Sequence, residues 1–105
     1  MASVMNTFET DVVVAREALA GLTRRMKGAR PEAARAFVNA ETDDDRDAAV
    51  ATYGAGFIRR GLRETAVLFT ARGDLKTADV FYALRDDIDP VTGEVFRLAD
   101  EPVDA

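Results

Sequence analysis

Apolar residues recur along most of this chain at alternating spacings of three and four, and this pattern restricts the fold more than any other feature. One series consists of Phe8, Val12, Ala15, Leu19, Leu22 and Met26. A second series consists of Ala48, Ala51, Ala55, Ile58, Leu62, Thr65 and Phe69. Such spacing places about one side chain per turn on a single face of an α-helix. Each series therefore predicts a helix with one buried stripe, and we predict an all-α protein.

The first half of the chain predicts two helices. The first extends from about Phe8 to Lys27, with Thr7 as its N-cap and Gly28 just beyond its end. The second is short and begins at Pro31, since proline fits the first helical position, where its missing N–H is not needed.

The third predicted helix is the longest, near residues 43–72. It opens at Thr42, which is followed by three aspartates whose charges suit the N-terminus of a helix. Its interior contains Gly54, Gly56 and Gly61. Glycines at these positions either kink a helix or allow another backbone to approach closely. The sequence leaves open whether this helix is continuous through residues 54–56.

The fourth predicted helix follows Gly73-Asp74 and ends at Asp89-Pro90, because proline cannot continue the helical hydrogen bonds. The following stretch, DPVTGEVF, predicts a tight turn and a short extended C-terminal tail. Residues 1–98 are then a single domain, a small helical bundle of about four helices, and residues 99–105 are a flexible acidic C-terminus. The expected core includes Leu19, Leu22, Ile58, Leu62, Phe69, Phe81 and Leu84.

Composition narrows the range of functions. The chain of 105 residues contains neither cysteine nor histidine. Disulfides are therefore excluded, and the commonest catalytic and metal-binding side chains are missing. We expect no enzyme, no cofactor and no metal site. No signal peptide and no apolar stretch long enough to span a bilayer are visible, so we expect a cytoplasmic protein without membrane contact.

Acidic side chains form two clusters in a chain of net charge −5. The first is Asp43, Asp44, Asp45 and Asp47. It lacks the spacing of a calcium loop, and a solvated helix start explains it more simply than a partner does. The second is Asp86, Asp87 and Asp89, at a predicted helix C-terminus, where the helix dipole disfavours negative charge. These seven carboxylates are the candidate partner-binding residues, most of all those of the second cluster.

One segment, residues 63–87, reads as helix, glycine turn and helix, which is the order of a helix-turn-helix DNA reader. The solvent face of its second helix would carry Lys76 together with Asp79 and Asp86. Two carboxylates against one ammonium would be repelled by backbone phosphates. An α-hairpin explains the segment more simply, and a small DNA-binding regulator is the alternative function.

The predicted function is a non-catalytic protein–protein interaction module, of adaptor or inhibitor type, that acts through a helical and acidic surface. In size and acidity the chain resembles phage-encoded inhibitors such as anti-CRISPR proteins, which implies an origin in a phage or mobile element. We also expect a homodimer in which small residues of the long helix allow two copies to pack closely. These residues are Ala48, Ala51, Gly54 and Ala55.

Overall fold

The computed structural model describes residues 7–22 and 30–96, and within them the chain forms five helices. They are α1 (Thr7–Ala20), α2 (Arg30–Asn39), α3 (Asp43–Tyr53), α4 (Ala55–Ala71) and α5 (Leu75–Asp87). The predicted all-α bundle is confirmed. Residues 99–105, predicted to be a flexible acidic C-terminus, lie outside the described residues.

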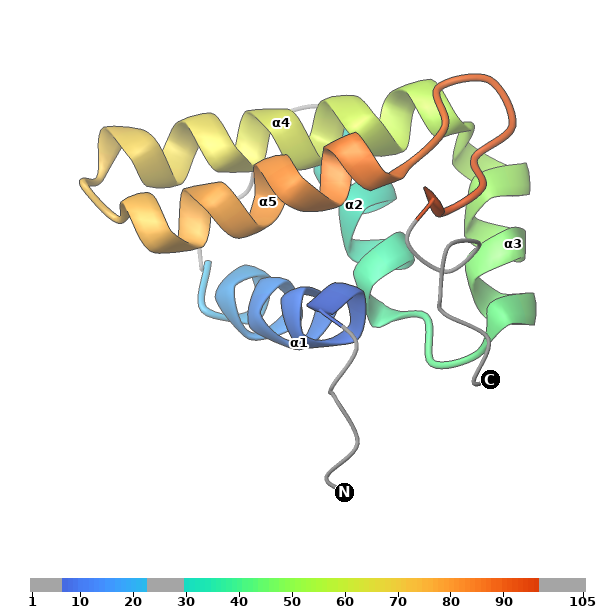
Figure 1. The fold of residues 1–105 in the computed structure, drawn as a ribbon, viewed down its shortest axis with the longest axis horizontal. Coiled ribbons are helices and arrows are strands. Elements are labelled where there is room, and N and C mark those ends of the chain that lie inside the picture. Colours follow the sequence, from blue (N-terminus) through green and yellow to red (C-terminus); the bar gives the residue numbers. More distant parts are fainter. Residues whose placement is uncertain (1–6, 23–29, 97–105) are drawn as a thin grey trace, which may run out of the picture.

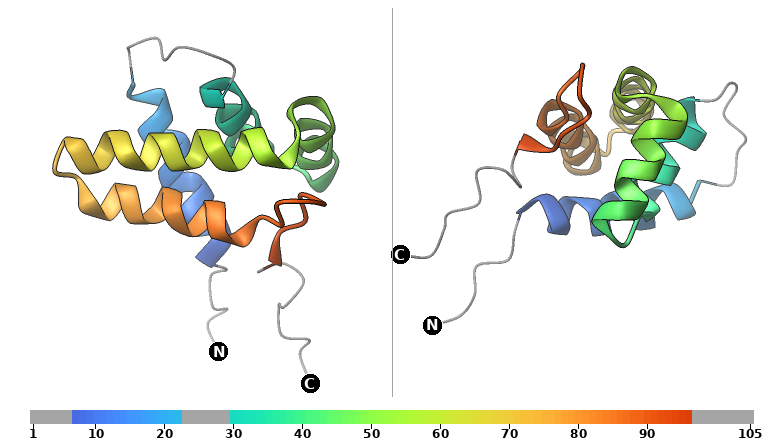
Figure 2. Two further views of the ribbon diagram at one scale, coloured as in Figure 1. Left: turned by 90° about the horizontal axis from the view of Figure 1, so that it is seen from above. Right: turned by 90° about the vertical axis from the view of Figure 1, so that its right-hand side faces the viewer.

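The α4–α5 hairpin forms one layer of the molecule. The two helices lie antiparallel and side by side in both figures, and α1 and α2 pack beneath them (Figures 1 and 2). The Phe69 and Phe81 rings stack between α4 and α5, with their centroids 5.7 Å apart. Asp74 starts α5 as predicted, because its Oδ1 accepts a hydrogen bond from the Thr77 N–H at 3.3 Å.

The core lies between these layers, and all seven side chains expected there are buried. Thr65 is the one polar side chain in the described part of the chain that is completely buried. Its hydroxyl donates a hydrogen bond of 2.7 Å to the Gly61 carbonyl oxygen, so burial leaves no unsatisfied donor.

The prediction of one long helix near residues 43–72 is wrong, because the chain breaks at Gly54 into α3 and α4. Gly54 has a φ of +87°, which residues with a Cβ rarely adopt. Its N–H still bonds the Val50 carbonyl oxygen, and its own carbonyl accepts the Ile58 N–H. Gly54 thus ends one helix and starts the next. Figure 1 shows α3 running across the direction of α4.

The first helix also ends earlier than predicted. α1 stops at Ala20, where Gly21 and Leu22 form a turn, although Leu22 is buried as expected. Met26, the last residue of the first apolar series, and Lys27 and Gly28, the predicted end of the helix, lie outside the described residues.

After α5 the chain turns back, as the sequence predicted. Ile88 and Val95 form an isolated antiparallel bridge, and both are buried. Gly93, at the turn, lies so close to α3 that a Cβ added there would come within 2.5 Å of Val50 Cγ1. The C-terminal turn therefore covers part of α3.

Candidate functional site

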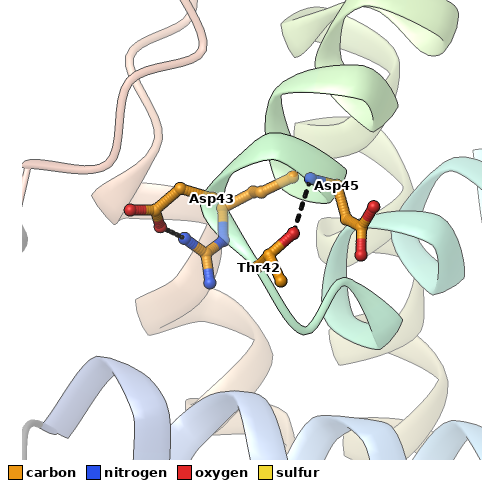
Figure 3. Close-up of polar contacts among 4 residues, drawn as sticks. Thr42, Asp43 and Asp45 are labelled. Carbon is orange, nitrogen blue, oxygen red and sulfur yellow. Dashed lines mark hydrogen bonds and ion pairs between the residues drawn. The ribbon is translucent and has the colours of Figure 1, made fainter.

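The start of α3 concentrates carboxylates on the surface of the molecule. Thr42 caps the helix, since its Oγ1 accepts a hydrogen bond from the Asp45 N–H at 3.0 Å (Figure 3). Asp43 pairs with Arg46, with 2.7 Å between Oδ1 and Nη1. One of the four clustered carboxylates is thus neutralised within the helix itself.

The other three, Asp44, Asp45 and Asp47, are exposed. No ion pair joins them to a cation among residues 7–22 and 30–96. Figure 3 shows the Asp45 carboxylate pointing away from the Asp43–Arg46 pair. We call these three residues the acidic face of α3. Ala48 and Ala51, which continue along the same helix, are exposed as well.

Arg46 attaches this helix to the bundle. Its guanidinium carbon lies 5.1 Å from the ring centroid of Phe8 in α1 and 5.9 Å from that of Phe37 in α2. The two rings meet edge to face, with their centroids 6.3 Å apart. Cation–π attraction at these distances is strengthened by burial, and the Arg46 side chain is only 14% exposed. The arginine therefore anchors the acidic start of α3 to the core.

The second predicted cluster has a different structural role. Asp86 pairs with its neighbour Arg85 at 2.7 Å, and Asp87 is half-buried. Asp89 shapes the C-terminal turn, because its Oδ1 accepts hydrogen bonds from the N–H groups of Val91 and Thr92, at 2.8 and 3.0 Å.

The two backbone hydrogen bonds, that from Thr92 most of all, lower the pKa of Asp89 below its ordinary value of 3.8. The sequence suggested that carboxylates at this helix end do not help the fold, and for Asp89 that suggestion is wrong.

The structure keeps the two acidic clusters on separate elements, one at the start of α3 and one around the end of α5. Within the described ranges no three acidic side chains converge to form a candidate metal site. Within the same ranges no helix has the length and apolar character needed to cross a membrane.

A groove along α1 was not predicted from the sequence. It consists of two adjoining hollows of about 320 and 330 Å³, the first between α1 and the start of α3 and the second between α1 and α2. Arg16 lines both of them, Arg46 lines the first, and Arg35 lines the second. In the sequence these arginines stand 11 to 30 positions apart, so no spacing rule connects them. Only the packing of α1 against α2 and the start of α3 brings them together.

Residues 63–87, which the sequence offers as a helix-turn-helix candidate, belong to the α-hairpin of α4 and α5. Its helices lie antiparallel along their lengths, whereas the helices of a helix-turn-helix unit cross steeply. Arg59 Nε donates to the Arg85 carbonyl oxygen at 3.2 Å and so ties the end of α5 to α4. Arg60 and Arg63 remain exposed on α4.

Comparisons of the chain with known protein families, with curated proteins and with solved structures found no match.

Proposed function

We propose that the protein is a non-catalytic module that binds another protein through the acidic face of α3. The observation that supports this most is the imbalance within α3, which buries only one side chain, Ala49, and presents three uncompensated carboxylates to solvent. A helix that contributes so little to the core is ordered here by a cap, by Arg46 and by the C-terminal turn. Its outer surface is thus held in a fixed shape, ready for a partner.

The chemistry of this face favours a basic partner. Carboxylates arranged on a rigid surface steer a positively charged protein during diffusion and fix its orientation. Ala48 and Ala51 lie beside them and keep the helix surface low, so that a partner can approach the backbone closely. Asp43 contributes less, because Arg46 already neutralises it.

The acidic residues at the end of α5 form a second part of the proposal. Asp86 and Asp87 border the C-terminal turn, and that turn packs against α3 through Gly93. A partner that covers the C-terminal turn as well as α3 would meet these residues. Asp89 does not belong to the docking surface, since its carboxylate holds the turn together. The same proposal places the protein in the cytoplasm, as an adaptor or inhibitor of its partner.

The test is affinity purification of the tagged protein from its host, with quantitative mass spectrometry. The variant Asp44→Lys, Asp45→Lys, Asp47→Lys should lose the partner. A matched control makes the same change of charge at three exposed carboxylates on other helices, Glu17, Glu32 and Asp79. The control should retain the partner. Thermal melts verify that both variants fold.

A partner that is captured equally by both folded variants would show that the acidic face of α3 is only a solvated surface. The docking surface would then have to be sought at Asp86 and Asp87 or on the exposed side of α4, and the double variant Asp86→Lys, Asp87→Lys would test the former.

A further inference from the structure

The groove along α1 carries positive charge on a protein whose net charge is −5. Its second hollow is lined by two arginines and one asparagine beside apolar side chains, and no carboxylate lines it: Arg16, Arg35, Asn39, Leu19, Ala20 and Leu22. Within the described part of the chain, neither arginine forms an ion pair. In the first hollow, Glu9 and Glu41 balance the arginines. The excess of arginines over lining carboxylates thus lies in the second hollow, which we call the arginine groove.

Arg16 is held in place before anything binds. Its Nε donates a hydrogen bond of 2.9 Å to the Val38 carbonyl oxygen in the last turn of α2. This bond fixes the plane of the guanidinium while leaving its two terminal nitrogens as possible donors. A guanidinium held in this way loses little conformational freedom on binding a carboxylate, and its planar fork suits that group.

The apolar part of the groove makes it more than a charged patch. Leu19 and Leu22 belong to the core but also line the hollow. An occupant must therefore offer carboxylates together with small or apolar side chains. A free inorganic anion would satisfy the arginines and leave the apolar surface uncovered.

The molecule itself displays a surface of this chemistry. The acidic face of α3 has Asp44, Asp45 and Asp47 next to the exposed methyl groups of Ala48 and Ala51. Each of these carboxylates lacks a cation within the described residues, just as Arg16 and Arg35 lack a carboxylate. The two surfaces are therefore complementary in charge, and each places apolar side chains beside its charged ones.

We propose that a second copy of this chain docks with the acidic face of its α3 against the arginine groove. The inference rests on the proposed function, and it names the partner of the same acidic face. The two surfaces adjoin one another, because Glu41 and Arg46, on either side of the first residues of α3, line the hollow next to the arginine groove. Two copies can thus use both surfaces reciprocally about a two-fold axis, which gives a closed dimer with two equal contacts.

This arrangement differs from the dimer expected from the sequence. That dimer used Ala55 and Gly54 as part of its contact. Ala55 is only 7% exposed and belongs to the core of the monomer, and Gly54 is half-buried at the break between the helices. Ala48 and Ala51 remain available, but the contact proposed here is made to the arginine groove of the other copy and not to its α3.

Sedimentation equilibrium of the purified full chain at low salt tests the proposal without any other component. The wild-type protein should form dimers at micromolar concentrations. The variant Arg35→Glu should weaken dimerisation about tenfold or more, since close charge pairs across an interface carry coupling of this order. Arg60→Glu is the matched control: it makes the same change of charge on an exposed face of α4 and should leave the dimer intact.

Charge reversal on the other surface completes the test. The variant Asp44→Lys, Asp47→Lys should dimerise as poorly as Arg35→Glu. The combined variant Arg35→Glu, Asp44→Lys, Asp47→Lys restores opposite charges at position 35 alone, because Arg16 and Asp45 are unchanged, and it should dimerise more tightly than the variant Asp44→Lys, Asp47→Lys. Raising the salt concentration should weaken the wild-type dimer, because salt screens its contacts.

Either of two results overturns the proposal. One is a wild-type protein that stays a monomer of 11.4 kDa at high micromolar concentration. The other is a combined variant that folds, as judged by its melting curve, yet dimerises no better than the variant Asp44→Lys, Asp47→Lys. A monomer that still captures a host protein through the acidic face of α3 would refute the self-association and leave the proposed function standing.

Discussion

Helices α3 and α4 share one apolar series in the sequence and behave differently in the structure. Along α4, Ile58, Leu62, Thr65 and Phe69 are buried, as the spacing predicts. Along α3, the members of the same series, Ala48 and Ala51, are exposed, and the one buried residue is Ala49. The periodicity therefore predicted the buried face of α4 correctly and that of α3 incorrectly.

The size of the side chains explains the difference. A buried leucine or isoleucine is stabilised by roughly 1.5–3 kcal/mol relative to an exposed one, which fixes the face that a helix turns inward. Alanine has a single methyl group to bury, so a series of alanines hardly favours one face over another. The orientation of α3 is set by its larger half-buried side chains, Arg46, Val50 and Tyr53. Helix α4 is thus packed against the core along its whole length, whereas α3 is packed through a few side chains.

The largest expected effect is in α4. Leu62 is completely buried, and Leu62→Ala should destabilise the protein by about 2–5 kcal/mol through lost burial and the cavity left behind. Val67, on the opposite side of the same helix, is 47% exposed, and Val67→Ala should change stability far less. Urea denaturation of both variants measures the contrast. Similar losses for the two variants would contradict the assignment of the buried face.

The break between the two helices gives the next effect. Gly54→Ala places a Cβ on a backbone with φ +87°, which should destabilise by about 1–3 kcal/mol. Gly56, two residues later, has ordinary helical geometry and no heavy atom within 4 Å of an added Cβ. Gly56→Ala should therefore stabilise by about 0.4–1 kcal/mol. Thermal melts of the two variants measure these opposite changes in stability. If α3 and α4 were one continuous helix in solution, the two substitutions would not have opposite effects.

Charge at the start of α3 has a smaller effect on folding. Replacing Asp44 and Asp45 by lysine puts positive charge at a helix N-terminus and should destabilise by about 0.3–1 kcal/mol for each residue. Asp86→Lys, in the last turn of α5, loses an exposed pair with Arg85 but gains a favourable charge at that position, so we expect little net change. Equal melting temperatures for the α3 and α5 variants would mean that the dipole of α3 contributes nothing measurable.

The smallest effect concerns pH and the C-terminal turn. Since the pKa of Asp89 is lower in the folded protein than its ordinary value of 3.8, its carboxylate stabilises the fold above that pH. This contribution should disappear as the pH falls through the lowered pKa. Asp89→Asn removes it at every pH, so the stabilities of variant and wild type should converge in acid. A constant difference from pH 7 down to pH 2 would assign the effect to something other than titration.

Much of the fold could be predicted from the sequence, because most helix boundaries depend on local signals. Thr42 and Asp74 cap their helices as expected, and the turn before Pro90 ends the last one. The sequence marks Gly54 as a possible break in the helix. The φ of Gly54, however, depends on how α3 packs against α2 and the C-terminal turn. Only tertiary contacts could therefore decide between one helix and two.

The candidate sites were predicted less completely. The acidic residues are visible as clusters because they are neighbours in sequence. The partners of Asp43 and Asp89 are also local, at positions 46, 91 and 92, but the contacts of Arg46 with Phe8 and Phe37 depend on tertiary packing. The arginine groove could not be predicted at all. Arg16 and Arg35 come from different helices, and each stands alone among residues of other kinds.

The contact between Gly93 and Val50 has a consequence for how the chain folds during its synthesis. Val50 leaves the ribosome 43 residues before Gly93. At a translation rate of about 5–20 residues per second, the two residues emerge several seconds apart. Throughout that interval α3 lacks the turn that covers it. α1 waits longer still for α5, the helix on which it packs, because more than 50 residues separate the two helices. The nascent chain thus exposes its first and third helices until its last turn emerges, and a chaperone that meets this protein would meet it there.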